Sequence, residues 1–341
     1  MSPQQRNQTW KPSIELLFAE APTMFGAIAE ETGSMADITA ALVKELREKT
    51  GVGMMDCKKA LNETSGDLEA AVDWLRKQGL AAAQKKAGRV ASEGLVGLYA
   101  EEKSAAIVEV NSETDFVSRN EDFQTLVRQV ASLALACDED LEKLLEMDYS
   151  NTGHTVAEEV NQLIATIGEN INIRRATGLS VDRGIVASYI HAATAPGLGR
   201  IGALVAVSSE GDPEKLAQLG HQLAMHVAAA SPQAVSIEEL NVKDVDRERA
   251  VLREQAESSG KPAEIIDKMV EGRLRKFYEE VVLLNQTFII DGETKVSKVI
   301  EQAVKDLGGS VEITGIRRFA LGEGIERKES DFAAEVGAQL K

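Results

Sequence analysis

The side chains that could bind a metal ion or act as nucleophiles are few and widely spaced. The 341-residue chain has two cysteines and four histidines: Cys57, Cys137, His154, His191, His221 and His226. A zinc site needs about four closely spaced ligands, and no cysteine is followed by a histidine at such a spacing. His221 and His226 are five residues apart, whereas a helical metal-binding pair is four apart. The spacing predicts no metal site, and two cysteines in so long a chain favour reduced thiols in the cytosol over disulfides.

One glycine motif could indicate dinucleotide chemistry. Residues Gly197–Gly202 read Gly-Leu-Gly-Arg-Ile-Gly. A dinucleotide site requires a helix that begins inside this motif, so that its N-terminus binds the pyrophosphate. The next residues, Ala203–Val207, are typical of a strand, and we expect a flexible hairpin loop here. The sequence has no Gly-x-x-x-x-Gly-Lys-Ser/Thr loop, so we expect no cofactor and no enzymatic reaction.

One aromatic side chain occurs in a polar connection. Residues 111–120 read Asn-Ser-Glu-Thr-Asp-Phe-Val-Ser-Arg-Asn, and the chain has 8 phenylalanines in 341 residues. Phe116 therefore either packs beneath its own fold or projects toward another molecule. A similar segment, Gly202–Asp212, is followed by Pro213 where the first has Phe116. The comparison weakens the packing interpretation without removing it.

The composition limits the kind of partner. The net charge of −17 argues against nucleic acid, whose phosphates bind clustered Lys and Arg. No apolar run approaches the roughly 20 residues of a membrane helix, so we expect a protein partner. Residues 1–34 contain two basic and four acidic residues, which fits neither a transit peptide nor a secretory signal. We expect a poorly ordered, dispensable extension there.

The N-terminal region is predicted to form three short helices. Apolar residues repeat at helical spacing after Asp37, a candidate N-cap, then in Met54–Thr64, and again from Asp67 to Gly79. We predict a compact three-helix module over residues 35–80 and a helical linker over residues 81–93.

The central region partly repeats itself. Strand-like Gly94–Tyr99 and Ala105–Val110 resemble Gly184–Tyr189 and Gly202–Val207. An apolar helical stripe follows each pair, and Ser118-x-x-Glu121 fits a capping box at the start of the first helix. We therefore predict two related β-β-α subdomains, residues 94–180 and 181–320, with Phe116 at a strand-to-helix junction.

Two further helical segments are predicted toward the C-terminus. Residues 242–281 are charged and interrupted by Ser258–Pro262, which favours an antiparallel helical hairpin. The hairpin is either two surface helices on a core or an arm for a partner or a second copy. The last segment, residues 321–341, is predicted to be a helical module with Phe332, Val336 and Leu340 on one face. The fold class is α+β.

Several segments resemble the bacterial elongation factor Ts family. Leu46–Leu61 and Glu109–Arg119 match the signatures of the family nearly residue for residue, and Ile167–Arg175 and Ser330–Val336 are also similar. The resemblance runs from Met35 to the C-terminus. It implies a ubiquitin-associated-like N-terminal module, a two-part core with a coiled-coil arm, and a C-terminal module.

The resemblance also implies a function in the cytoplasm. It implies a guanine nucleotide exchange factor that acts on elongation factor Tu in translation elongation. The residues expected to contact the partner are Thr114, Asp115, Phe116 and Val117 near its magnesium site, Met54, Met55 and Lys58 in the N-terminal module, and Phe332 and Val336 in the last helix. For Met54 and Met55, ordinary core packing is an equally weighted alternative.

Two other functions are compatible with parts of the sequence. An adaptor would need residues 37–80 alone for binding, without exchange activity. An enzyme would use the Gly197–Gly202 loop and would bind a dinucleotide.

Overall fold

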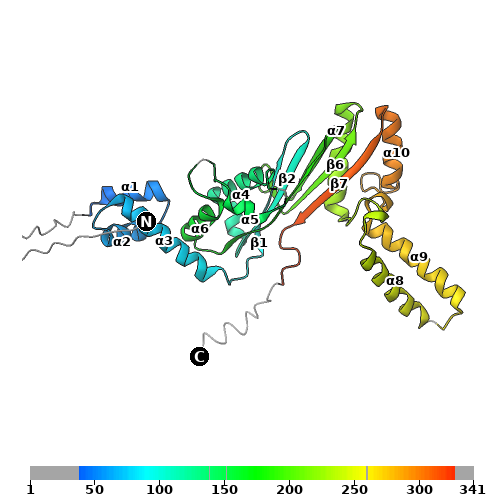
Figure 1. The fold of residues 1–341 in the computed structure, drawn as a ribbon, viewed down its shortest axis with the longest axis horizontal. Coiled ribbons are helices and arrows are strands. Elements are labelled where there is room, and N and C mark those ends of the chain that lie inside the picture. Colours follow the sequence, from blue (N-terminus) through cyan, green and yellow to red (C-terminus); the bar gives the residue numbers. More distant parts are fainter. Residues whose placement is uncertain (1–37, 138, 151, 259, 327–341) are drawn as a thin grey trace, which may run out of the picture. The chain divides into compact units, whose positions relative to one another are not determined.

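The computed structural model describes residues 38–137, 139–150, 152–258 and 260–326. The predictions for residues 1–34, and for Phe332 and Val336, lie outside the described residues. The fold mixes helices and antiparallel sheets (Figure 1). The helices are α1 (Ala40–Thr50), α2 (Met54–Glu63), α3 (Leu68–Lys86), α4 (Glu121–Ala134), α5 (Leu141–Glu146), α6 (Val156–Ile167), α7 (Pro213–Ala230), α8 (Val242–Glu257), α9 (Ala263–Val281) and α10 (Val296–Leu307). The strands are β1 (Glu93–Ala100), β2 (Ser104–Ser112), β3 (Ile171–Ser180), β4 (Ile185–His191), β5 (Leu198–Gly199), β6 (Ile201–Ser209) and β7 (Val311–Ala320).

The first three helices pack around one small core. Leu46, Cys57, Leu61 and Ala71 are fully buried in it. Helix α1 begins at Ala40 because the Thr39 side chain accepts a hydrogen bond from the Leu42 N–H. The prediction that Asp37 is the N-cap is therefore wrong.

Helix α3 is longer than the sequence predicts. It continues through Gly79 to Lys86, so residues 81–86, the first part of the predicted linker, are the last part of this helix. A Cβ atom on Gly79 would lie 3.3 Å from the Cβ of Ala165 in α6. The glycine therefore lets two helices approach closely, and it does not end the helix.

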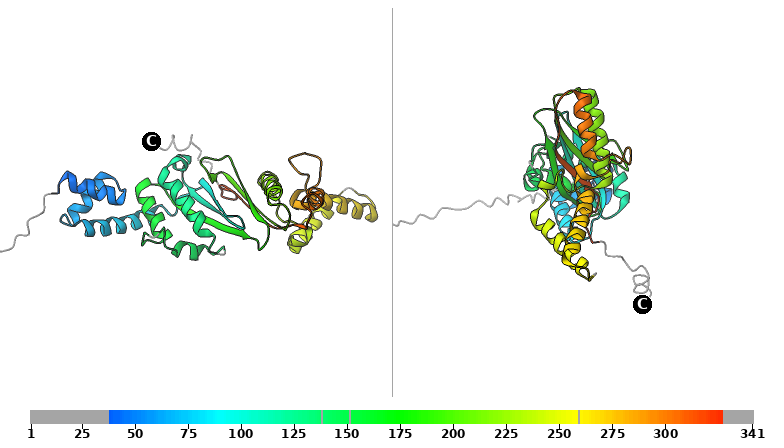
Figure 2. Two further views of the ribbon diagram at one scale, coloured as in Figure 1. Left: turned by 90° about the horizontal axis from the view of Figure 1, so that it is seen from above. Right: turned by 90° about the vertical axis from the view of Figure 1, so that its right-hand side faces the viewer.

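Two antiparallel sheets form the centre of the fold. The strand orders are β3-β2-β1-β5 and β4-β6-β7. Helices α4 and α6 pack with the first sheet, and α7 and α10 with the second; Figure 2 shows α7 and α10 side by side. Between the sheets lies a separate apolar cluster that includes Ile107, Leu204 and Phe319. Strands β2 and β6 are thus buried on both faces.

The two sheets share local features that the sequence repeat did not include. The strand order β3-β2-β1 of the first sheet corresponds to β7-β6-β4 in the second. Each half therefore contains a third strand, and also a second helix, beyond the predicted β-β-α unit. Both middle strands carry an irregularity at the same aligned place, Glu109/Val110 and Ala206/Val207. These features extend the similarity between the halves beyond a β-β-α unit.

The glycine motif forms part of a sheet. Leu198 and Gly199 pair with Gly97 and Val96 of β1, and Leu198 is fully buried. The prediction of a flexible loop is wrong here, because the segment adds an edge to the first sheet. As predicted, Ala203–Val207 is strand, so no helix N-terminus faces this motif.

Helices α8 and α9 form the predicted hairpin (Figure 1). Leu252 and Ala256 of α8 pack on Ile266, Val270 and Leu274 of α9. The hairpin therefore has an apolar seam of its own. Helix α10 and strand β7 then follow.

Candidate functional site

The segment around Phe116 is a short 3₁₀ helix between β2 and α4. It spans Asp115–Arg119, and α4 begins two residues later. The N-cap of α4 is Asn120, whose Oδ1 accepts from the Phe123 N–H at 2.9 Å. Ser118 is therefore not the cap: its hydroxyl donates to the Asp115 carbonyl at 2.6 Å. The capping-box prediction is wrong, although the strand-to-helix junction was predicted.

The side chains of this segment point in different directions. Phe116 is 78% exposed and Asp115 is also exposed, whereas Val117 is only 4% exposed. Val117 packs in the core cluster that contains Phe123 and Leu126. The structure thus places the aromatic ring in solvent and assigns Val117 to the core of its own fold. Val117 was predicted as a contact residue, but its side chain is not available at the surface.

The residues before Phe116 are hydrogen-bonded to the turn that precedes β3. The Glu169 carboxylate accepts from the Thr114 N–H at 2.9 Å and from the Thr114 hydroxyl at 2.6 Å. In the reverse direction, the Asn170 N–H donates to the Glu113 carboxylate at 2.6 Å. We call these three bonds the loop brace. Sequence reasoning missed Glu169, because local patterns do not pair residues 55 positions apart.

The predicted residues of the N-terminal module form a second exposed surface. Met54 and Met55 begin α2 and are 47% and 79% exposed, and Lys58 is exposed one turn later. The core-packing alternative for the two methionines is therefore wrong. Cys57 lies on the buried face of this turn, and its thiol donates to the Val52 carbonyl at 3.4 Å. Burial raises the pKa of the Cys57 thiol, so this cysteine is a packing residue.

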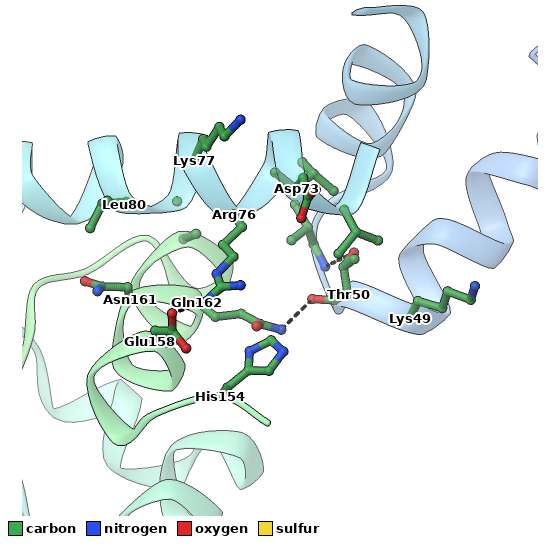
Figure 3. Close-up of a pocket in the computed structure, with 15 residues that line it drawn as sticks. Lys49, Thr50, Asp73, Arg76, Lys77, Leu80, His154, Glu158, Asn161 and Gln162 are labelled. Atoms are coloured by element: carbon green, nitrogen blue, oxygen red, sulfur yellow. Dashed lines mark hydrogen bonds and ion pairs between the residues drawn. The ribbon is translucent and has the colours of Figure 1, made fainter. Parts of the chain in front are cut away.

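A cavity of about 650 Å³ lies between the end of α1, α3 and α6 (Figure 3). An ion pair joins Arg76 of α3 to Glu158 of α6, and the Gln162 side chain donates to the Thr50 carbonyl at 3.3 Å. These contacts join the three-helix module to α6. None of the predicted site residues lines the cavity, so the candidate site and the cavity are different places.

Across the described ranges, no group of three or more His, Cys, Asp or Glu side chains could hold a metal ion. His226 is buried: its Nδ1 accepts from the Ile289 N–H at 3.2 Å, so its Nε2 donates to Gln286 at 2.9 Å. Burial lowers the pKa of His226, which suits a neutral packing residue. In the part of the chain that the structure describes, no helix has the length and apolar character to cross a membrane.

The fold is α+β, with an exposed aromatic side chain on a hydrogen-bonded loop and exposed methionines on a separate helix. Exposed, adaptable side chains of this kind suit contact with another protein. Comparison with known proteins identifies the family. The family model for elongation factor Ts matches residues 113–323, more than half of the chain. Elongation factor Ts of Rhodospirillum rubrum is 63% identical over 308 residues, covering 90% of this chain and 100% of the relative. Elongation factor Ts of Rhizobium etli strain CFN 42 is 54% identical over 307 residues, which again cover 90% of this chain and 100% of the relative. The chain belongs to the elongation factor Ts family.

Proposed function

We propose that this chain is a guanine nucleotide exchange factor in translation elongation, acting in the cytoplasm. It binds elongation factor Tu with GDP bound, promotes release of GDP, and so allows GTP to bind. Membership of the elongation factor Ts family supports this role. The single observation that carries the mechanism is the exposed ring of Phe116 on a hydrogen-bonded loop.

The proposed mechanism uses binding energy and no covalent step. In GTPases, backbone donors hold the phosphates of the nucleotide, and Mg²⁺ bridges phosphate oxygens to the protein. Complete burial of an aromatic side chain gains roughly 1.5–3 kcal/mol. If the partner accommodates Phe116 only when its magnesium site is distorted, this free energy weakens the hold on Mg²⁺ and GDP. Binding linkage is reciprocal, so bound nucleotide must weaken the binding of this chain to elongation factor Tu to the same extent.

The other contacts add affinity. Asp115 lies beside the ring, and Met54, Met55 and Lys58 form the contact of the N-terminal module. Thr114 has its polar groups bonded to Glu169 and Val117 is buried, so we assign both to holding the loop. We propose that Phe332 and Val336 of the C-terminal module also contact the partner.

We propose the following domain organisation. Residues 1–34 are an extension, 35–80 the ubiquitin-associated-like module, 81–93 the linker, 94–180 and 181–320 two related core subdomains, and 321–341 the C-terminal module. The shared strand order and the aligned irregularities support a duplication. The hairpin formed by α8 and α9 is a coiled-coil arm for the partner or for a second copy.

The test is release of labelled GDP from elongation factor Tu. The chain should accelerate release, and Phe116→Ala should slow the accelerated rate by roughly tenfold or more, as expected for loss of a buried ring. The melting temperature should stay near that of the native chain because the ring is exposed. Tyr99→Ala, a change at another exposed ring, is the matched control and should leave the rate unaltered.

Two outcomes would contradict the proposal. An unaltered rate for Phe116→Ala would remove the proposed role of the ring, and a large fall in melting temperature would restore the packing interpretation. Binding without any exchange would favour the adaptor alternative.

A further inference from the structure

The turn between α6 and β3 is shaped to present a carboxylate to the Phe116 loop. Helix α6 ends at Gly168, which has a φ of 90° and donates its N–H to the Ile164 carbonyl. This left-handed conformation favours glycine and reverses the chain direction. Glu169 follows at once, and its two oxygens accept the two Thr114 donors at 2.9 and 2.6 Å. Hydrogen bonds to a charged acceptor are stronger than neutral ones.

The chain that leads out of the three-helix module is bonded to two residues of the loop brace. The Asn170 side chain donates to the Arg89 carbonyl at 2.8 Å, and the Arg89 guanidinium lies 3.4 Å from the Glu113 carboxylate. Asn170 is itself buried. Three segments distant in sequence thus meet at the residues that precede Phe116 in the chain.

Phe116 has little packing of its own that could fix its position. Its ring is 78% exposed, so the backbone on each side must define where it points. On the C-terminal side, Val117 is buried in the core. On the N-terminal side, Thr114 is held by Glu169. A side chain already held in its binding conformation loses less conformational entropy when it binds.

We propose that Glu169 is a positioning residue for nucleotide exchange: it fixes Thr114 and thereby holds the Phe116 ring in the orientation that the partner binds. This inference rests on the proposed function, and it assigns Glu169 an action through Phe116 and not through direct contact with the nucleotide. The brace acts before the partner arrives, so its loss reduces exchange even though Phe116 is still present.

The test is Glu169→Gln in the full chain, measured as accelerated release of labelled GDP from elongation factor Tu. Glutamine has the same size, but its amide offers one acceptor oxygen and places an NH₂ group against a donor. We expect exchange to slow by about tenfold, since small misplacements of a positioned group have effects of this size or larger. Thr114→Val, which removes one of the two donors, should slow exchange less.

Glu139→Gln is the matched control. The Glu139 carboxylate also accepts from a threonine hydroxyl, that of Thr177, and is paired with Arg317. Glu139 takes no part in the loop brace. If loss of any such glutamate–threonine bond reduced exchange through general destabilisation, the Glu139→Gln variant would also accelerate GDP release less than the native chain. We expect its exchange rate to equal that of the native chain.

A double-mutant cycle with Phe116→Ala identifies the route of the effect. Residues that act as one unit have non-additive effects. Glu169→Gln should therefore slow exchange about tenfold in the native chain and hardly at all in the Phe116→Ala background. Each rate is measured well below the melting temperature of its variant, so that all four proteins are folded.

The outcomes separate this inference from the proposed function. If Phe116→Ala slows exchange but Glu169→Gln and Thr114→Val do not, the brace has no positioning role. If Glu169→Gln has the same effect with and without the ring, Glu169 acts by another route, and the inference is wrong. If Phe116→Ala leaves the rate unaltered, the proposed role of the ring fails, and this inference fails with it. If the native chain does not accelerate GDP release at all, the proposed function itself fails.

Discussion

Neighbouring residues in the first turns of α2 differ sharply in environment. Met55 is 79% exposed, whereas Cys57 is fully buried. An exposed thioether contributes little to the stability of its own fold but is well suited to an adaptable contact surface. Met55 is therefore a residue at which binding and folding can be measured separately.

We expect Met55→Ala to weaken binding of elongation factor Tu by roughly tenfold, because complete burial of a methionine side chain gains about 1.5–3 kcal/mol. The free energy of unfolding should change by less than about 0.5 kcal/mol, as for most surface substitutions. Titration calorimetry and denaturant unfolding measure the two quantities. Val304→Ala, at an exposed apolar residue of α10, is the control and should change neither. Unaltered binding for Met55→Ala would remove this residue from the proposed interface.

The sequence predicted the exposed ring better than the exposed methionines. Phe116 could be compared with Pro213 at the same place in the second half, and that comparison favoured a ring that projects away from its own fold. Met54 and Met55 had no such counterpart, and helical spacing cannot say which face of a short helix is buried until its neighbours are known. The burial of Val117 was also missed, because the side chains of a 3₁₀ turn do not alternate between two faces as those of a strand do.

At the scale of elements, two glycines occupy corresponding positions at the start of the first strand of each half: Gly94 is the second residue of β1, and Gly184 directly precedes β4. Gly94 has a φ of 120° and Gly184 a φ of 105°. A Cβ atom would lie 2.2 Å from the Val110 carbonyl oxygen in the first case and 2.0 Å from that of Val207 in the second. Each glycine thus allows its strand to lie directly against the neighbouring strand.

Gly94→Ala and Gly184→Ala should each destabilise the fold by roughly 2–4 kcal/mol, because alanine is strained at this φ and collides with a backbone oxygen. The control is Gly272→Ala within α9. Gly272 has open space around its Cβ position and no positive φ, so alanine should stabilise the helix by roughly 0.5–1 kcal/mol. Urea unfolding measures all three. Equal effects at Gly94 and Gly272 would contradict the steric argument.

Most helices and strands were predictable because their apolar spacing is local. The two helices of the hairpin, for example, lie close to the bounds predicted for them. Strand β5 and the continuation of α3 through Gly79 were missed because the contacts that determine them are distant in sequence. Leu198 is fixed by pairing with β1, and Gly79 is fixed by contact with Ala165. Local periodicity contains no information about either partner.

At the scale of the whole molecule, a buried carboxylate joins the two sheets. Glu109 of β2 is fully buried and ion-paired with Arg174 and Arg175 of β3. The irregularity at Glu109 places two consecutive arginines opposite one residue, as a β-bulge does. The same carboxylate accepts from the Gly322 N–H at 2.8 Å, just beyond β7 of the second sheet. Glu109 therefore connects the two sheets through a hydrogen bond between residues 213 positions apart in the sequence.

This network makes stability depend on acid pH. Burial by itself raises the pKa of Glu109, but hydrogen bonds from the Gly322 N–H, Asn111 and Arg175 outweigh it and hold the pKa below the ordinary value of 4.5. In acid, the unfolded chain then binds a proton at this residue before the folded chain does. The stabilisation is therefore complete above the ordinary pKa and is lost as the pH falls through the lowered, folded-state pKa.

Glu109→Gln should reduce the free energy of unfolding by roughly 2–3 kcal/mol at pH 7, because Arg174 and Arg175 both lose the buried carboxylate that they pair with. The difference between the native chain and this variant should shrink as the pH falls below the ordinary carboxyl range, since the native carboxyl is then protonated and the two side chains become alike in charge. Urea unfolding at a series of pH values measures that difference directly, and other carboxyl groups cancel in the subtraction. Glu312→Gln, at an exposed residue of β7, should lower stability by less than about 0.5 kcal/mol at pH 7. A difference for Glu109→Gln that is constant with pH would show that the charge of Glu109 does not hold the two sheets together.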